Sequence, residues 1–410
     1  MVSRRDWIIG SAGALGGAVL TGMPDAATSQ GAPAVPAVPV DPTKVPGGPT
    51  SARGERSPFE TPSRAPTGEI TGNSLTPLEK LTGQITPSDL HFERHHAGIP
   101  VIDPSTHALL IHGLVDRPMR LSMDDIRRFP QVTRVHFVEC AGNGRAAFRA
   151  PKPDLTPQKV SGMISNTEWT GVPLATVFRE VGVKPEAAWF LAEGGDACLM
   201  TRSVPMEKAL DDALLVWAQN GEPLRPAQGY PLRLLLPGWE GNINVKWLRR
   251  LELGTAPWMT RWETSKYTDP LPNGTARRFS FEQDAKSIIT TPAHPERLSS
   301  RGWRPISGLA WSGRGRIQRV EVSTDGGTTW HEAELMGPSL PKATVRFQYM
   351  WNWEGQASRL LSRATDETGY VQPTRSALIA ARGIGTDYHF NQIVGCDVAT
   401  DGAVTFFGES

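Results

Sequence analysis

The spacing of apolar and polar residues divides the chain into three stretches. In residues 31–66 no helix or strand period is evident, and proline recurs every third residue from Pro33 to Pro42, which favours an extended spacer. From about residue 75 to 270, helical patterns alternate with apolar strands, as in a mixed α+β domain. From about residue 300, alternating strands between glycine turns predict a β-sandwich.

Three helices are predicted in the α+β stretch. Ser122 is a suitable N-cap for a helix that Pro130 ends, and a second helix stops at Gly182. A longer amphipathic helix is predicted over residues 204–221. In the last stretch the Asp-Gly-Gly of residues 325–327 predicts a hairpin. The β-sandwich carries no nucleophile or metal motif, so its expected role is structural or dimer-forming.

The N-terminus has the pattern of an export signal. Arg4 and Arg5 precede an apolar, glycine-rich run from Trp7 to about Leu20. This run is short for a membrane span, although a single N-terminal anchor is an alternative. It fits a twin-arginine signal cleaved near Ala27. Twin-arginine export carries folded proteins, often because a cofactor was inserted beforehand.

Composition limits the classes of partner and cofactor. The formal net charge is +1, so the net charge favours no particular class of partner, and we expect no nucleic-acid partner. Three cysteines are too few for a framework of several disulfides. The sequence has neither Cys-x-x-Cys nor Cys-x-x-Cys-His, so we expect no haem covalently bound to this chain.

Candidate chemistry begins with "RVHFVECAGNGR", residues 134–145, which predicts a strand running into a glycine-rich turn. Cys140 ends the strand, and Gly142 and Gly144 allow a ligand to approach the backbone. Neighbouring arginines favour a thiolate. A buried core cysteine, a catalytic nucleophile and a metal ligand are the three interpretations, and no signature of a Cys-His protease is present.

Two further segments indicate an anion site. "HFERHHAGIP", residues 91–100, has histidines four apart, but without the His-Glu-x-x-His order. Gly98, with Pro87 and Pro100 on either side, predicts a loop rather than a zinc-binding helix. A loop with Arg94, His95 and His96 suits an anionic ligand such as phosphate. Arg233 interrupts the apolar strand "YPLRLLLPG", and a buried arginine needs an anion.

Taken in order, these motifs resemble a known family. "FERHHAGIP", "FVECAGNGR", "GYPLRLLLPGWEGNINVKWLRR", "TSKY" and "VEVSTDGGTTW" are similar to motifs of the sulfite oxidase family of molybdenum enzymes, over residues 75–400. Within that family the likeness is to the SoxC-type molybdenum subunits of sulfane dehydrogenases, through "LTPLEKL", "HFERHHAGIP", "GLVDRPM" and "DETGYVQP".

The resemblance implies a molybdenum–molybdopterin cofactor whose metal is bound by the thiolate of Cys140, a soft ligand. The residues that it implies on the substrate side are Arg94, Arg145, Tyr267 and Arg382. The residues that it implies beside the pterin or its phosphate are His96, Cys140, Asp196, Arg233 and Lys246. Gln228 departs from the pattern, because the family often has a pterin-contacting histidine there.

The expected fold is α+β, with a sulfite-oxidase-type molybdopterin domain followed by an immunoglobulin-like β-sandwich dimerisation domain. The expected boundaries follow. They are 1–27 for the twin-arginine signal peptide, 28–74 for the Pro-rich linker, 75–280 for the molybdopterin-binding catalytic domain and 281–410 for the dimerisation domain.

The implied reaction is oxygen-atom transfer in the periplasm. Its expected substrate is sulfane sulfur on a carrier protein, and oxidation of sulfite to sulfate is the alternative. Reductases of the methionine sulfoxide type rank third, because they lack the β-sandwich. A non-enzymatic alternative is an exported binding protein. The expected partners are a c-type cytochrome subunit, SoxD-like, which accepts the electrons, and a second copy of this chain bound through the C-terminal domain. We expect no membrane span in the mature protein.

Overall fold

The computed structural model describes residues 41, 44, 46–271 and 273–409, so the predicted export signal lies outside the described residues. The chain divides into two compact units, one ending at Ser57 and the other beginning at Pro58. All the elements below belong to the second unit. Among the described residues, none of the helices has the length and apolar character needed to cross a membrane.

The second unit begins with a three-stranded antiparallel sheet of β1 (Ala65–Gly68), β2 (Gly72–Leu75) and β3 (Glu93–His95). Its first strands fall within the segment that we predicted to be a linker up to residue 74. β1 and β2 pair with each other, and β2 also pairs with β3, about twenty residues further along the chain. Composition does not reveal such a distant pairing. The pairing of Asn73 with Arg94 places this sheet beside the predicted anion-binding loop.

An antiparallel sheet and a mixed sheet follow. In the first sheet, β7 (Ile164–Pro173) lies between β10 (Leu214–Gln219) and β6 (Val132–Glu139). The short strands β11 (Glu222–Pro223) and β12 (Arg233–Leu235) both pair with β10. The second sheet has the order β5 (Met119–Ser122), β4 (Ala108–Gly113), β13 (Leu248–Gly254), β8 (Trp189–Gly194) and β9 (Thr201–Pro205).

Two of the predicted helices are confirmed. α1 (Met123–Arg127) begins at Ser122, whose hydroxyl accepts a hydrogen bond from the Asp125 amide in a capping box. α4 (Leu174–Val181) ends at Gly182, whose φ of 71° is left-handed and therefore suits glycine. The remaining short helices of this domain are α2 (Arg145–Arg149), α3 (Pro157–Ser161) and α6 (Arg261–Thr264).

The helix predicted over residues 204–221 is wrong. α5 covers only Met206–Asp211, and β10 begins at Leu214. Leu215 and Val216 are fully buried in a strand that pairs with β7 on one side and β12 on the other. Sheet pairing overrides a sequence in which apolar residues also fit a helical period.

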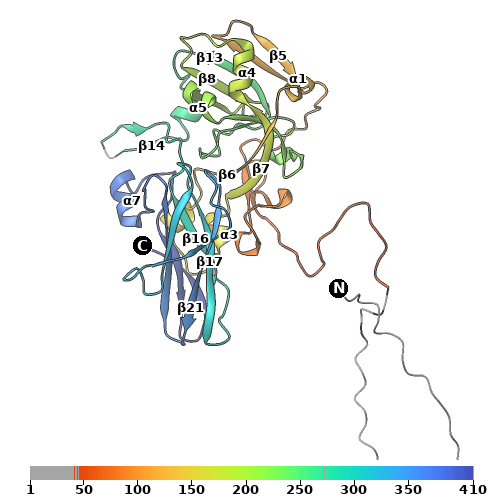
Figure 1. Cartoon of the computed structure of the whole chain (residues 1–410). Helices are drawn as coiled ribbons and strands as arrows, with labels where there is room; N and C mark the ends of the chain where they lie inside the picture. The colour runs from red at the N-terminus through yellow and green to blue at the C-terminus, as the bar shows by residue number, and fades with distance from the viewer. Residues whose placement is uncertain (1–40, 42–43, 45, 272, 410) are drawn as a thin grey trace, which may run out of the picture. The chain divides into compact units, whose positions relative to one another are not determined.

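The C-terminal part is the predicted β-sandwich (Figure 1). One sheet contains β16 (Lys286–Thr291), β17 (Gly302–Trp311), β21 (Val345–Trp353) and β20 (Glu334–Met336). The other contains β19 (His331–Glu332), β18 (Ile317–Ser323), β22 (Ser358–Asp366), β23 (Val394–Val398) and β24 (Val404–Gly408). Ile306, Val320, Phe347 and Leu360 are fully buried in its core.

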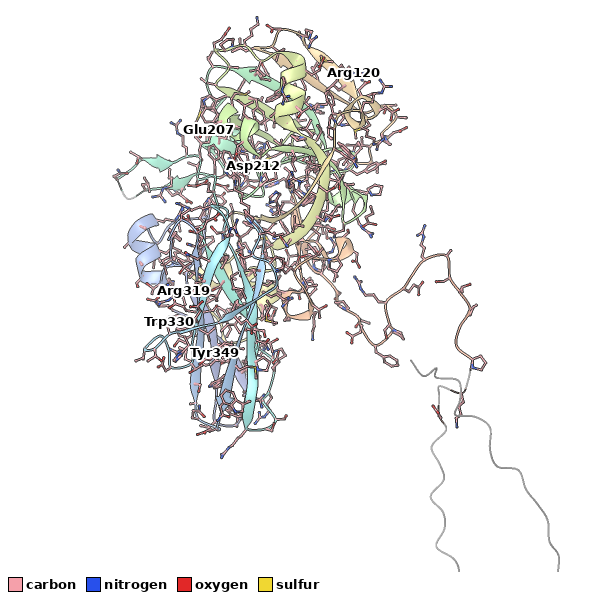
Figure 2. The ribbon with its side chains drawn as sticks, viewed as in Figure 1. Arg120, Glu207, Asp212, Arg319, Trp330 and Tyr349 are labelled. Carbon is pink, nitrogen blue, oxygen red and sulfur yellow. The ribbon has the colours of Figure 1, made fainter. Side chains whose placement is uncertain are left out.

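Side chains on the surface of the sandwich add further contacts. Figure 2 shows Arg319, Trp330 and Tyr349 in this part of the molecule. The guanidinium of Arg363 lies 4.2 Å from the ring centre of Trp330, a cation–π contact. Between the two domains lie β14 (Asp269–Pro270) and β15 (Ala276–Arg277), and α7 (Arg375–Arg382) follows β22.

Candidate active site

Cys140 lies directly after the last residue of β6. Its amide donates to the Met163 carbonyl at 3.0 Å, and its own carbonyl accepts from the Asn143 amide at 2.9 Å. The turn closes at Gly144, whose φ of 97° a residue with a side chain would adopt only with strain. The backbone on both sides of the thiol is therefore fixed.

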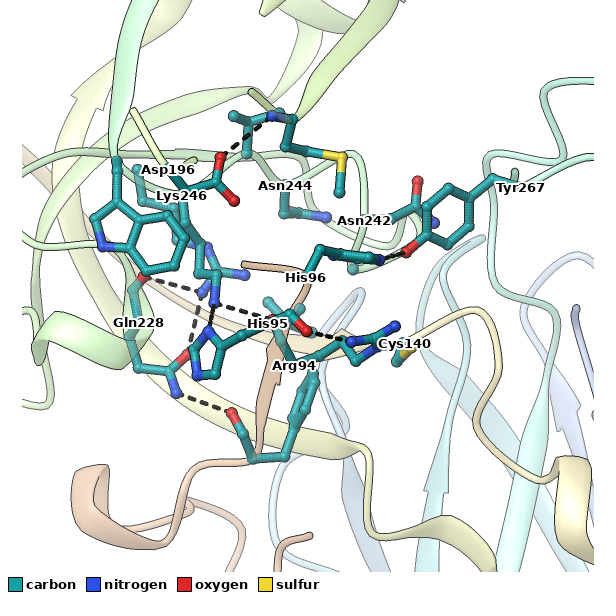
Figure 3. Close-up of a pocket in the computed structure, with 17 residues that line it drawn as sticks. Arg94, His95, His96, Cys140, Asp196, Gln228, Asn242, Asn244, Lys246 and Tyr267 are labelled. Carbon is teal, nitrogen blue, oxygen red and sulfur yellow. Dashed lines mark hydrogen bonds between the residues drawn. The ribbon is translucent and has the colours of Figure 1, made fainter. Parts of the chain in front are cut away.

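A cavity of about 620 Å³ lies in front of this thiol (Figure 3). Seven of the site residues expected from the sequence line it, although they are far apart along the chain. They are Arg94, His96, Cys140, Asp196, Arg233, Lys246 and Tyr267. The cavity is thus bounded by β3, β12 and the loops that follow β6, β8, β12 and α6.

A second, more open cleft of about 1520 Å³ adjoins the first. Arg94, His96, Cys140 and Tyr267 line both spaces, and Arg145 lines the second alone. Cys140 therefore lies at the boundary between a cavity and a cleft that opens to solvent. Arg382 lines neither space. It ends α7, with a guanidinium nitrogen 3.5 Å from the Asp284 carboxylate.

The cavity holds cations whose partners in the chain are neutral. Arg233 is 3% exposed, and burial lowers its pKa to about 9. Its guanidinium donates to the Gln228 carbonyl at 3.2 Å and lies 5.2 Å from the ring centre of Trp169. The Nε atom of Arg233 has no hydrogen-bond partner among the described residues. A buried cation with an unused donor fits an anionic ligand.

Lys246 reinforces this charge. Its Nζ donates to the carbonyls of Arg94 and Ala227, at 3.1 and 3.0 Å. Burial holds the pKa of Lys246 well below its usual value, so an anion in the cavity would stabilise the charged form. Together with Arg94 and Arg233, Lys246 makes the cavity cationic, with Asp196 the carboxylate among its lining residues.

His95 has a role that sequence reasoning missed. Its Nδ1 lies 2.9 Å from Lys246 Nζ, and its Nε2 lies 3.2 Å from the Glu93 carboxylate. Because the ammonium donates, Nδ1 accepts and Nε2 carries the proton that bonds Glu93. Burial lowers the pKa of His95 and favours this neutral ring. The alternation of side chains along a strand could have indicated the contact between Glu93 and His95, since these residues lie on the same face of a strand.

Tyr267 is held from several directions. Its hydroxyl lies 2.9 Å from His96 Nε2, and its amide donates to the Tyr388 hydroxyl at 3.1 Å. Its φ is 52°, a strained value for tyrosine. The buried Arg202 guanidinium lies 5.3 Å from its ring centre. Neither Tyr388 nor Arg202 carried a sequence motif that indicated this position.

The protonation states in this group follow from burial. Burial raises the pKa of Tyr267, and burial lowers the pKa of His96 to about 4. A neutral imidazole therefore accepts the hydrogen bond from a neutral phenol. This pair can hold a proton at the boundary between cavity and cleft.

The expectation that arginines alone make Cys140 a thiolate needs correction. Burial raises the pKa of this thiol, and the opposing effects of Arg94 and Arg145 are smaller. A bound metal ion deprotonates a coordinating thiol outright. A metal ligand therefore fits Cys140 better than a free nucleophile. The cationic cavity beside it fits the phosphate of a pterin cofactor.

Two family models match the chain. The model for the oxidoreductase molybdopterin binding domain matches residues 96–262, and the Mo-co oxidoreductase dimerisation domain matches residues 277–396. The crystal structure of the sulfane dehydrogenase SoxCD from Paracoccus pantotrophus is similar, with 43% identity and a TM-score of 0.88. The match covers 91% of this chain and 98% of that one.

Curated relatives include longer proteins. The chain is 33% identical to a nitrate reductase [NADH] of Ulva prolifera and 32% identical to the mitochondrial sulfite oxidase of Mus musculus. Each match covers 75% of this chain, but only 40% of the reductase and 61% of the oxidase. The chain thus spans less than two thirds of either relative.

We predict that Cys140→Ser abolishes substrate oxidation while the thermal unfolding midpoint of the metal-free protein is unchanged. Serine is a harder and less electron-donating ligand. The matched control is Cys396→Ser, which alters another buried cysteine, 4% exposed and in the β-sandwich. Metal analysis and steady-state assays are the measurements. Near-normal turnover by Cys140→Ser would rule out the metal-ligand role.

Proposed function

Because the chain belongs to the sulfite oxidase family of molybdopterin oxidoreductases, we propose that it is the molybdenum subunit of a sulfane dehydrogenase and oxidises sulfane sulfur on a carrier protein. The chain is a molybdenum oxidoreductase of the Sox type with a molybdenum–molybdopterin cofactor. The observation that supports the proposal is the position of Cys140, between a cationic cavity and an open cationic cleft.

The cavity residues divide the work of holding the cofactor. Cys140 would bind the metal, and Arg233 and Lys246 would bind the phosphate through fixed positive charge. Asp196 and His96 would contact the pterin, with the Asp196 carboxylate held in place by the Met200 amide at 3.2 Å. When bound, the cofactor supplies oxygen-atom transfer to sulfur and takes up two electrons.

The cleft residues act on the substrate. Arg94 and Arg145 would place positive charge beside an anionic sulfur group, and such charge is most useful when it is already oriented. Arg145 is oriented by the second domain, since its guanidinium donates to the Asp387 carbonyl at 2.6 Å and lies 5.8 Å from the Tyr388 ring centre. The Tyr267 hydroxyl, with His96 as its hydrogen-bond partner, would hold a proton beside the oxygen atom that is transferred to sulfur. In this arrangement Arg382 has no direct contact with the substrate.

The lining of the cleft favours a protein-borne substrate. The cleft opens to solvent, and its lining includes the exposed cations Arg261 and Lys266, which suit a charged partner. Similarity to SoxCD supports the same choice. Sulfite is the second candidate, because Arg94 and Arg145 both line the cleft and would also attract a small anion.

The other two alternatives are less well supported. A match to the dimerisation-domain model at residues 277–396 argues against a reductase of the methionine sulfoxide type, which lacks the β-sandwich. Membership in a family of molybdenum enzymes argues against a non-enzymatic binding protein.

The proposal is tested by measuring the metal and pterin content of the purified protein, then its turnover with sulfite and with a persulfide-bearing carrier protein. We expect the carrier to give the higher kcat/KM. Efficient turnover of sulfite, with no reaction of the carrier, would instead establish a sulfite dehydrogenase.

In the same assay Arg94→Gln should lower kcat/KM about thirtyfold, since a charge-assisted contact contributes roughly 2 kcal/mol. Arg134→Gln is the matched control, because Arg134 is an exposed arginine on β6 whose guanidinium bonds only a backbone carbonyl, that of Thr133. Equal kinetics for the two variants would show that Arg94 does not contact the substrate.

We further propose that the chain forms a homodimer through residues 281–410 and passes its electrons to a c-type cytochrome subunit. Light scattering should give twice the chain mass for the protein alone, and a larger mass with the cytochrome. Substrate should reduce the isolated protein once, and the cytochrome should restore repeated turnover. A monomeric enzyme, or one that oxygen rapidly reoxidises with formation of peroxide, would contradict this assembly.

Export through the twin-arginine route is proposed from Arg4 and Arg5, which lie outside the described residues. Substitution of both by lysine should retain the precursor in the cytoplasm, because the export receptor recognises the arginine pair rather than its charge. Cell fractionation is the measurement. Normal periplasmic enzyme in the double variant would refute the proposal.

A further inference from the structure

The residue that precedes Cys140 is a buried carboxylate with a complete set of partners. Glu139 is 2% exposed. Its Oε1 accepts from Lys286 Nζ at 3.0 Å and from the side-chain Nδ2 of Asn143 at 2.8 Å. Its Oε2 accepts from Trp311 Nε1 at 2.7 Å. A buried charge this well satisfied is rigid, because any rotation breaks several hydrogen bonds together.

Two of these partners belong to the β-sandwich. Lys286 begins β16 and Trp311 ends β17, and the two residues face each other in the antiparallel register of these strands. They are 4% and 0% exposed, and Lys286 Nζ lies 5.6 Å from the ring centre of Trp311. The sandwich therefore presents a preformed pair of donors to the end of β6.

The same lysine also holds the turn that follows Cys140. Lys286 Nζ donates to the Asn143 carbonyl at 3.1 Å. At Gly144 an added Cβ would lie 3.1 Å from Lys286 Nζ and 2.8 Å from the Phe390 carbonyl, so the turn packs directly on the second domain. The His389 amide donates to the Ala141 carbonyl at 2.8 Å. Contacts from the sandwich thus reach residues 139, 141, 143 and 144, on both sides of the thiol.

These contacts bear on the direction of the thiol. Side chains of consecutive residues in an extended segment point to opposite sides. Glu139 points to the β-sandwich, whereas Cys140 lines the cavity. A rotation of the chain that displaces the Glu139 carboxylate also turns the sulfur, and the angle of a metal–thiolate bond depends on where that sulfur is held.

We propose that Lys286 and Trp311 are positioning residues, through which the β-sandwich sets the orientation of Cys140 toward the metal. The β-sandwich would then have a second role beside dimerisation. This inference rests on the proposed function, in which Cys140 is the metal ligand. The competing explanation is that Lys286 and Trp311 only stabilise the packing of the two domains.

The test uses full-length holoenzyme carrying Trp311→Phe or Lys286→Met. Trp311→Phe keeps an aromatic ring but removes the donor to Glu139, and Lys286→Met keeps an aliphatic chain of similar length. The readouts are the Mo–S distance from X-ray absorption, the electron paramagnetic resonance g-values of the one-electron-reduced metal, and kcat with KM. We expect altered g-values and Mo–S distance, and kcat about tenfold lower with KM little changed, as is typical when a contact behind a metal ligand is removed.

Lys208→Met is the matched control. Lys208 is 5% exposed, its Nζ lies 2.6 Å from the Asp212 carboxylate and donates to the Pro237 carbonyl at 2.8 Å, and it lies 5.1 Å from the ring centre of Trp239. It thus has the same kinds of partner as Lys286. Lys208→Met should lower the thermal unfolding midpoint without changing the spectrum of the metal.

The outcomes separate the two explanations. Wild-type spectra and kcat in Trp311→Phe, with a lowered unfolding midpoint only, would overturn the inference and leave a packing role. If Lys286→Met fails to fold, Trp311→Phe decides the question, because it leaves Lys286 and Glu139 and an aromatic ring in place. Failure of the proposed function is recognised separately, since Cys140→Ser would then turn over at a near-normal rate.

Discussion

The structure depends on a charge that the chain leaves unbalanced. Arg233 and Lys246 are surrounded by carbonyls, an imidazole and aromatic rings, and burial lowers the pKa of both. Removing cations from water is costly unless an anion is near. An anionic cofactor would supply that anion, so we expect the protein to be more stable with its cofactor than without it. The export route proposed for this chain carries folded proteins, so it would require assembly of the cofactor before transport.

Much of this site could be predicted from the sequence. Cys140 stands at a strand end followed by glycines, and Arg233 interrupts an apolar run, so both were identified from local pattern. Ser122 and Gly182 marked helix ends through backbone geometry that depends on neighbours alone. Family motifs added His96, Asp196 and Lys246. Each of these signals is contained within a few residues.

What the sequence could not provide depends on distant contacts. The local pattern of apolar residues around Leu214 predicts a helix, but pairing with β7 and β12 makes this segment a strand. His95 bonds Lys246 across 151 positions of the chain. The thiol of Cys140 has arginines nearby, but its pKa responds more to burial than to them. Tyr388 and Arg202 hold Tyr267 from separate elements. No local pattern carries such information.

The contrast between cavity and cleft also bears on the choice of substrate. A small anion such as sulfite is bound most strongly where water is excluded, because charge–charge attraction strengthens as the effective dielectric constant falls. The cleft is open, and Arg145, Arg261 and Lys266 are exposed on its lining. Exposed cations around an opening attract a charged partner from a distance and orient its approach. Only Arg94 reaches inward to the wall shared with the cavity. A free anion would leave water in the open cleft. A larger molecule would cover the opening and exclude that water, so the cleft is better suited to a sulfur group that projects from such a molecule.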